Sequence, residues 1–237
     1  MLIQKAENDK YWFSRGFGRL VALTEQRLCD RITRDTFGFY GLQLGVSPNS
    51  LLRRSPILSR ARVGLNGDCD IIADWKTLPI ADDSADFVLL AHALEAADDP
   101  KSVLREAVRV LRPEGRIFII GFNPFSLLAL FGGGGRVPWR SKWLSLARVN
   151  DWLALLDITT AQGVFAVFLP PLAESRHRKR VALLEKAGRR WWPMAGGVYC
   201  ILGVKRHLGM RVVMPVFKKT PLTNRIPMSD AKKKHSL

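Results

Sequence analysis

Cysteine is scarce in this chain, and the few cysteines follow neither a disulfide nor a metal pattern. Only Cys29, Cys69 and Cys200 occur among 237 residues, without a Cys-x-x-Cys pair. An odd number at unrelated spacings excludes a disulfide framework and gives no support to a zinc site. We therefore expect no bound metal, and we expect the cysteines to be buried, reduced thiols of a cytoplasmic protein.

An apolar leader is also missing, because the first ten residues already carry four charged side chains. Charge is absent from residues 117–135, and this stretch of 19 residues has the length of a membrane span. Asn123, Pro124 and the run Gly132–Gly135 would break a spanning helix and leave backbone groups unpaired in lipid. We expect neither export nor a membrane span, but a buried strand followed by an apolar loop over the ligand-binding edge. The aromatic residues of this region, expected to be core and lid packing, are Phe122, Phe125, Phe131, Trp139 and Trp143.

Positive charge dominates, but only in the C-terminal quarter. Of the formal net charge of +16, residues 1–173 carry +3 and residues 174–237 carry +13. The basic side chains fall into Arg176–Arg180, then Lys186, Arg189 and Arg190 before Trp191-Trp192, then Lys218, Lys219, Arg225 and Lys232–Lys234. A solvated face, an anionic membrane surface and RNA are all consistent with such a pattern. The neighbouring tryptophans favour a membrane surface, so the cytoplasmic protein could bind peripherally to the inner face of the membrane. RNA is the weaker alternative, since no RNA-binding motif is present.

Length and composition predict one domain with a tail. A hydrophobic fraction of 47% in 237 residues is sufficient for one sizeable core. Residues 218–237 are polar, charged and contain proline, so we expect a disordered tail after a domain of residues 1–217. Within the domain we expect an amphipathic helix over 11–34, a core over 38–169, a basic helical insert over 172–190 and a last strand over 198–204.

The most informative stretch is a strand, helix and strand in the middle of the chain. Phe87–Ala91 is a continuous apolar run, which is typical of a strand covered on both faces. Asp99 before Pro100 is a typical helix start. Gly115 ends that helix, and a second apolar run follows over Ile117–Ile120. In open α/β sheets, ligands bind where parallel strands end, so we expect the functional edge to lie after these two runs.

The same residues resemble a known family. Residues 74–86, 92–95 and 109–116 resemble the small bacterial type-11 methyltransferase-domain proteins, which are class I S-adenosylmethionine-dependent methyltransferases. The resemblance implies an α/β fold with a Rossmann-like, doubly wound sheet, mostly parallel but with an antiparallel closing pair of strands. For those strands we expect residues 161–169 and 198–204, preceded by a helix that Asn150 caps.

One motif departs from this family. Its members bind the methionine end of the cofactor over a glycine-rich turn, which follows an acidic residue after the first strand. Here the turn is Gln43–Asn49, where Gly45 alone remains and Pro48 removes a backbone donor. Only 29 positions separate Gly45 from Asp74, and this span must hold a helix, the second strand and the start of the third. Asn66-Gly67 is a turn dipeptide, so a crossover helix hardly fits between the second and third strands. We expect one edge of the sheet to be trimmed.

The resemblance also implies site residues. Asp74 would accept a hydrogen bond from the adenine amino group, and Trp75 would cover the ring. His92 would face the sulfonium and the acceptor, either as a general base of near-neutral pKa or as a packed turn residue. Glu95 and Asp98 are expected to be turn and capping groups. The full predicted cofactor set is Gln43, Gly45, Ser47, Asp74, Trp75, Leu90 and Ala91.

Two functions remain open from the sequence. The first is methyl transfer from S-adenosylmethionine to a small-molecule or lipid-like acceptor, which needs positioning more than a catalytic base. The second is an inactive, methyltransferase-like protein that binds membrane or RNA through its basic C-terminal region. The intact central motifs support the first function, and the altered Gln43–Asn49 turn supports the second.

Overall fold

The computed structural model describes residues 11–66, 69–131, 138, 142–168, 190–191 and 194–206. The chain divides into a compact unit of residues 1–207 and a second unit of residues 208–237. The expected tail over 218–237 lies outside the described residues, as does the expected basic insert except for Arg190.

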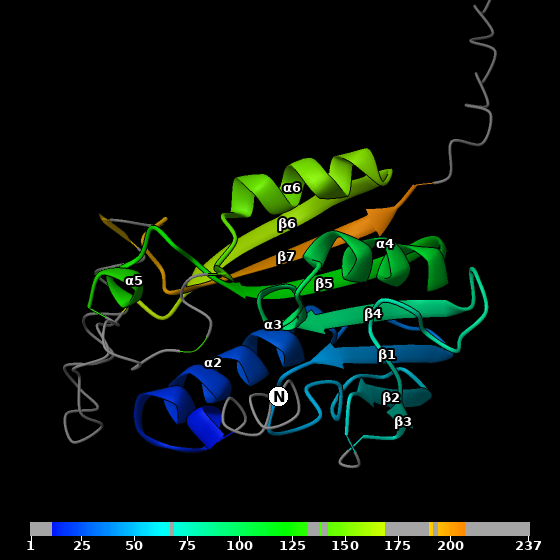
Figure 1. The fold of residues 1–237 in the computed structure, drawn as a ribbon, viewed down its shortest axis with the longest axis horizontal. Coiled ribbons are helices and arrows are strands. Elements are labelled where there is room, and N and C mark those ends of the chain that lie inside the picture. Colours follow the sequence, from blue (N-terminus) through cyan, green and yellow to red (C-terminus); the bar gives the residue numbers. More distant parts are fainter. Residues whose placement is uncertain are drawn as a thin grey trace, which may run out of the picture. The chain divides into compact units, whose positions relative to one another are not determined.

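A seven-stranded sheet in the order β3-β2-β1-β4-β5-β7-β6 forms the centre of the first unit (Figure 1). The strands are β1 (Tyr40–Gly45), β2 (Ser59–Gly64), β3 (Ile71–Ile72), β4 (Ala85–Ala91), β5 (Leu111–Phe122), β6 (Ile158–Ala166) and β7 (Val198–Lys205). The helices are α2 (Gly16–Ile32), α3 (Ala93–Ala96), α4 (Pro100–Val110), α5 (Leu127–Phe131) and α6 (Leu146–Leu155). The strands β1 to β5 pair in parallel, while β7 is antiparallel to β5 and β6. The predicted doubly wound sheet with an antiparallel closing pair is thus confirmed.

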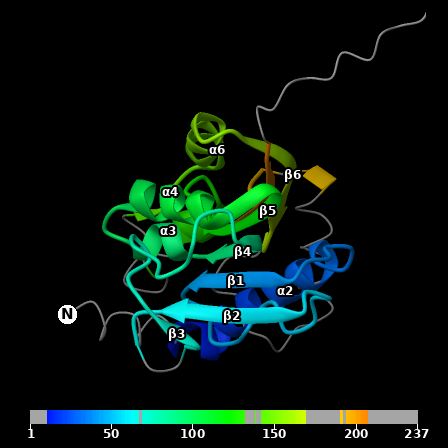
Figure 2. The ribbon, with the colours of Figure 1, turned by 90° about the vertical axis from the view of Figure 1, so that its right-hand side faces the viewer.

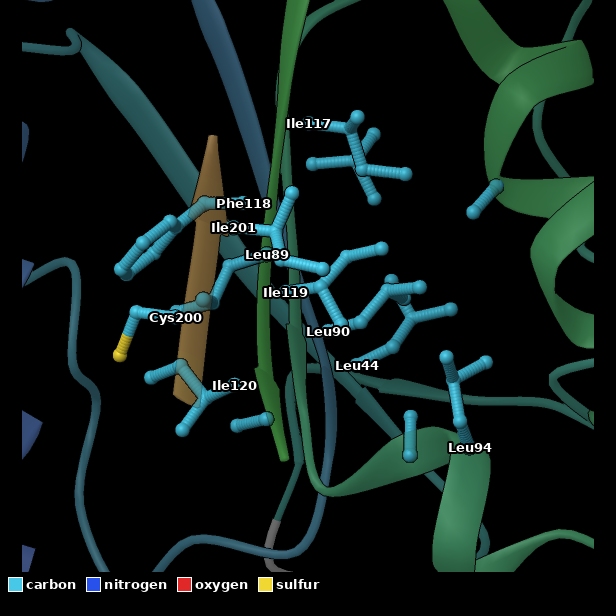
Figure 3. Packing of buried hydrophobic residues seen from close by; sticks show 14 of the residues in the cluster. Leu44, Leu89, Leu90, Leu94, Ile117, Phe118, Ile119, Ile120, Cys200 and Ile201 are labelled. Carbon is cyan, nitrogen blue, oxygen red and sulfur yellow. The ribbon is translucent and has the colours of Figure 1, made fainter. Parts of the chain in front are cut away.

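The middle of the sheet is the core. Every residue of β4 is buried, as expected for a strand between two layers of helices. Phe118, Ile120 and Cys200 point to one side of the sheet, and Ile117 and Ile119 point to the other (Figure 3). The helices α4 and α6 cover one face and α2 covers the other (Figure 2). Strand alternation therefore supplies both layers of the core.

The helix α4 begins where the sequence predicts and ends earlier. The Asp99 side chain accepts hydrogen bonds from the backbone N–H groups of Lys101 and Ser102, at 3.1 and 3.2 Å. The helix ends at Val110, and Leu111 already pairs with Ala85, so β5 begins five residues before Arg116. A register shift between this first pair and the main ladder accommodates the turn residues inside β5.

One edge of the sheet is trimmed, as predicted. The strand β3 has only two residues and pairs in parallel with β2, after a short connection instead of a crossover helix. The helix expected between the first and second strands is wrong, because residues 46–58 between β1 and β2 form turns without a helix. The described connections that follow β1 and β2 therefore contain no crossover helix, whereas α3 and α4 connect β4 to β5.

Four outer elements differ from expectation. The first helix is interrupted at Arg15, because Gly16 has φ +47°, and α2 begins only there. Ser145, not Asn150, caps α6, since its side chain accepts a hydrogen bond from Arg148 N at 3.3 Å. Strand β6 covers residues 158–166 instead of 161–169. The expected loop after β5 contains the short helix α5.

Candidate functional site

The carboxyl edge of the sheet, where β1, β4 and β5 end, has its topological switch point between β1 and β4. The chain leaves β1 toward β2 on one side and leaves β4 toward β5 on the other. In open α/β sheets the ligand-binding crevice lies at such a switch point. At this point Gly45 has φ +113°, and a Cβ atom there would overlap the carbonyl oxygen of Ala91. The next backbone N–H, of Val46, donates to the same oxygen at 2.9 Å. Only glycine fits this position.

Gln43 and Ser47 hold the turn that follows β1. The buried Gln43 amide accepts a hydrogen bond from Leu51 N at 2.7 Å and donates one to Asn49 O at 3.1 Å. The Ser47 hydroxyl also donates to Asn49 O, at 2.9 Å. These side chains satisfy backbone groups that a helix would otherwise satisfy. Gln43, in the place of the family's acidic residue, thus stabilises the altered turn.

Asp74 and Trp75 follow β3 at the same edge but face different surroundings. The Asp74 carboxylate is half exposed, accepts a hydrogen bond from Lys76 N at 3.0 Å and lies 3.6 Å from Lys76 Nζ. The Trp75 indole is buried and donates its N–H to Val63 O, at the end of β2, at 3.1 Å. Asp74 is therefore accessible to a ligand, while Trp75 joins the end of β2 to the loop after β3.

Leu90 and Ala91 end β4 and are fully buried. They pair with Leu44 and Gly45 of β1, and with Ile119 and Ile120 of β5. Their backbone forms the floor of the crevice at the switch point. The structure thus brings Gly45, Leu90 and Ala91 together, with Gln43 and Ser47 on the adjoining turn.

His92 lies in the interior of the protein, beneath α2. It has φ +54°, and its Nε2 lies 2.8 Å from the Glu25 Oε1 of α2. Its Nδ1 lies 3.8 Å from Glu95 Oε1. The imidazole stacks on Phe122 at a ring distance of 4.2 Å, and Phe13 lies 5.2 Å away. His92 therefore contacts two carboxyl groups within an aromatic environment.

The near-neutral pKa expected for His92 is wrong. Burial alone would lower this pKa, but the charge of Glu25 and hydrogen bonds to Glu25 and Glu95 outweigh burial and raise it to about 9. At neutral pH the imidazole is therefore protonated. It donates hydrogen bonds and has no lone pair with which to accept a proton.

Glu95 is a buried member of the same cluster and not a surface turn group. Its Oε1 accepts a hydrogen bond from Phe122 N at 2.7 Å. Within the described residues, its Oε2 and the buried Tyr199 hydroxyl have no hydrogen-bond partner. Burial and the charge of Glu95 raise the pKa of Tyr199 well above its usual value. Asp98, by contrast, is exposed and pairs with Lys142 Nζ at 2.7 Å.

Sequence reasoning missed Glu25, although the sequence contained a signal. Glu25 lies four residues after Val21 and three before Leu28, which places a carboxyl group on the apolar stripe of the first helix. A charged residue is seldom buried unless it is paired. This position therefore indicated a buried partner, which the structure identifies as His92.

The aromatic residues after β5 divide between core and surface. Phe122 and Trp143 are buried and stack at a ring distance of 4.8 Å, whereas Phe125 is exposed. Trp139 lies outside the described residues, and so does the side chain of Phe131. Phe122 and Trp143 thus confirm the expected packing role.

The remaining sequence expectations concern thiols, metals and membrane spans. Cys29 and Cys200 are buried free thiols, and Cys69 is partly buried. Burial, with the charges of Asp30 and Glu25, raises the pKa of Cys29 to about 12, which keeps that thiol protonated. The described residues contain no cluster of His, Cys, Asp and Glu suited to a metal ion. No described helix is long and apolar enough to cross a bilayer.

Comparison with known proteins agrees with this architecture. A family model described as a methyltransferase domain matches residues 55–119. The uncharacterized protein YafS of Escherichia coli (strain K12) is 33% identical over 152 residues, which are 62% of this chain and 63% of the relative. A malonyl-[acyl-carrier protein] O-methyltransferase of Halorhodospira halophila is 38% identical over 42% of this chain and 31% of its own. The chain thus spans less than two thirds of the length of these curated relatives.

Solved structures show the same fold at low sequence identity. A methyltransferase of Thermotoga maritima, described as a possible histamine N-methyltransferase, superposes with a TM-score of 0.63 at 18% identity, over 84% of this chain and 95% of its own. A SAM-dependent methyltransferase of Archaeoglobus fulgidus gives a TM-score of 0.56 at 18% identity, over 77% and 93%. Residues 55–119 thus match the methyltransferase-domain family, and over most of its length the chain has the fold of these methyltransferases.

Proposed function

We propose that this protein is an S-adenosylmethionine-dependent methyltransferase that acts on a small-molecule or lipid-like acceptor in the cytoplasm. The observation that carries the proposal is the switch point, where the glycine-only contact of Gly45 with Ala91 lies on the carboxyl edge that also bears the exposed Asp74. Sheets of this class bind their ligands at such an edge. The free, buried thiols of Cys29 and Cys200 support a reducing compartment.

The residues present fit the cofactor. Asp74 offers an exposed carboxylate for the adenine amino group, while the buried Trp75 supports the loop that carries Asp74 instead of covering the ring. At the other end of the crevice, Gly45 lets the backbone approach the methionine end closely, and Ser47 offers a hydroxyl. The bound cofactor would supply an electrophilic methyl group, for which the protein needs mainly to hold an acceptor in line.

His92 contributes by position in this proposal. As an imidazolium bonded to Glu25 it fixes α2 over the ends of β4 and β5, where an acceptor of this class would lie. It is not available as a general base while it carries its proton. The transfer therefore depends on an acceptor that is already nucleophilic.

Titration calorimetry with S-adenosylmethionine and S-adenosylhomocysteine tests the proposal. Asp74→Ala should weaken binding by about tenfold to a hundredfold, because a hydrogen bond to a charged group contributes about 1.5–3 kcal/mol. The thermal midpoint should stay unchanged, since the carboxylate is half exposed. Asp82→Ala is the matched control, because Asp82 is another exposed carboxylate, paired with Arg109 away from the crevice. Absence of binding by the folded wild-type protein would refute the proposal.

A further inference from the structure

The opposite edge of the sheet, where β1 and β2 begin, carries a cluster of exposed apolar side chains. We call it the amino-edge patch, and its members with their exposed fractions are Phe37 (77%), Phe39 (63%), Tyr40 (59%) and Leu58 (73%). The two segments are adjacent, because Leu58 N donates to Gly38 O at 3.2 Å and Ser59 N donates to Phe39 O at 2.8 Å. An exposed cluster of this kind marks an interaction site more often than scattered apolar residues do.

The protein holds this patch in a fixed shape. A single oxygen of the buried Asp86 accepts hydrogen bonds from Phe39 N and Tyr40 N, both at 2.8 Å. The other oxygen pairs with Arg112. Gly38 lies so close that an added Cβ would stand 2.6 Å from Asp86 Cβ. A buried carboxylate therefore fixes the backbone from which these aromatic side chains project outward.

Exposed cationic side chains lie near the patch in the chain. Arg34, Arg53 and Arg60 are exposed on the segments that lead into it, while Asp35 is the exposed acid among them. The Arg60 guanidinium donates to Arg53 O at 2.9 Å, which fixes it over the loop before β2. The patch thus combines apolar side chains with nearby positive charge, which complements an anionic surface.

The strand β7 ends at the same edge. Gly41 pairs with Phe87, Phe87 with Arg116, and Arg116 with Val204, so that one line across the sheet joins the start of β1 to the end of β7. Three strand spacings of about 4.8 Å, roughly 14 Å, separate these ends. The 31 residues that follow Arg206 contain seven Lys and Arg and one Asp. The described part of the chain therefore ends at the edge that bears the patch, and the sequence that follows is strongly basic.

We propose that the amino-edge patch docks the protein on an anionic lipid bilayer. Phe37, Phe39 and Leu58 have no group that could read a base or pair with a polar partner, and they suit insertion at the boundary of headgroups and acyl chains. The exposed arginines beside the patch would meet the anionic headgroups. This docking is independent of methyl transfer, because it leaves the carboxyl edge, at the other end of the strands, facing water.

Co-sedimentation of the full chain with vesicles tests this inference. The wild-type protein should bind vesicles of phosphatidylcholine with phosphatidylglycerol and should be released by high salt, but should not bind phosphatidylcholine alone. The double variant F37S/F39S should lower the partition coefficient by about tenfold or more without a change in thermal midpoint, since both side chains are exposed. L58S, which lies outside the turn held by Asp86, should lower it in the same direction. Cofactor binding should be unaffected in both variants.

The matched control is F125S/L130S, since Phe125 (79%) and Leu130 (69%) are equally exposed but lie after β5 at the carboxyl edge. This variant should bind vesicles within about twofold of the wild type. Loss of binding in this variant, with F37S/F39S unaffected, would overturn the assignment. Failure of the wild type to bind anionic vesicles would also overturn it. The assignment would likewise be overturned if RNA of equal total charge displaced the protein from the vesicles. Self-association in the absence of lipid, abolished in F37S/F39S, would also overturn it.

Discussion

Because of the buried pair of Glu25 and His92, the stability of this protein should fall as the pH becomes alkaline. Both side chains lie in the interior, and the Glu25 carboxyl is the principal reason that His92 keeps its proton. The pKa of His92 rises from 6.5 to about 9 on folding. A shift of this size corresponds to about 3 kcal/mol of stability from this one group.

The direction of the effect follows from the raised pKa. Below pH 6.5 the imidazole is protonated in both states, so that the full contribution of the pair is present. Between pH 6.5 and 9 the folded protein keeps the proton while the unfolded chain releases it. The free energy of unfolding should therefore fall by about 3 kcal/mol as the pH rises through this window, and His92 should contribute no further change above it.

Urea unfolding of the wild type and of Glu25→Gln, from pH 6 to pH 10, measures this effect. The glutamine keeps an acceptor oxygen but removes the charge, so the variant should be less stable by about 3 kcal/mol at pH 6. The two proteins should converge near pH 10, because the wild-type pair has then lost its charge attraction. Glu114→Gln is the control, since Glu114 pairs with Arg206 on the surface at 2.8 Å and should cost less than about 1 kcal/mol.

An NMR titration gives an independent reading, because the chain has only four histidines. One imidazole should titrate near pH 9 and should shift to lower pH in Glu25→Gln. A wild-type His92 that titrates at or below its ordinary value of 6.5 would refute the reasoning. So would a stability difference between the two proteins that stays constant from pH 6 to pH 10.

Three further substitutions test local features of the fold. Gly45→Ala should lower the free energy of unfolding by about 3 kcal/mol or more, measured by urea unfolding, because its φ of +113° and the overlap with Ala91 both oppose a Cβ; a loss below about 1 kcal/mol would contradict the close contact. Ser145→Ala should cost about 1 kcal/mol through loss of the α6 cap. Asn150→Ala should stay within about 0.5 kcal/mol, and the reverse order would show that Asn150 is the cap after all.

Local pattern was sufficient for the central unit of the fold. The run Phe87–Ala91 has no polar alternation, so it could only be a strand buried on both faces, and the structure buries all of it. Asp99 with Pro100 specified the start of α4 through interactions within one turn. Where the signal was equally local but ambiguous, as between Ser145 and Asn150, the prediction chose the wrong cap.

The turn after β1 shows where local reasoning ends. Its missing glycines were visible in the sequence, and so was the shortage of residues for crossover helices before β3. What takes the place of the helix was not visible, because the hydrogen bonds of Gln43 to Leu51 and Asn49 depend on how the loop folds back on the sheet. The amide in place of a carboxylate is therefore explained only by the folded turn.

The sequence by itself determined the family resemblance, the order of strands and helices in the middle of the chain and the trimmed edge, because these depend on residues within a few positions of one another. The environment of His92 was decided only by tertiary structure. Glu25 is 67 residues from His92 in the chain, and only the packing of α2 against the sheet brings its carboxyl within 2.8 Å of the imidazole. Burial next to that carboxyl moves the pKa away from neutrality and changes the expected base into a buried cation, a result that no local pattern contains.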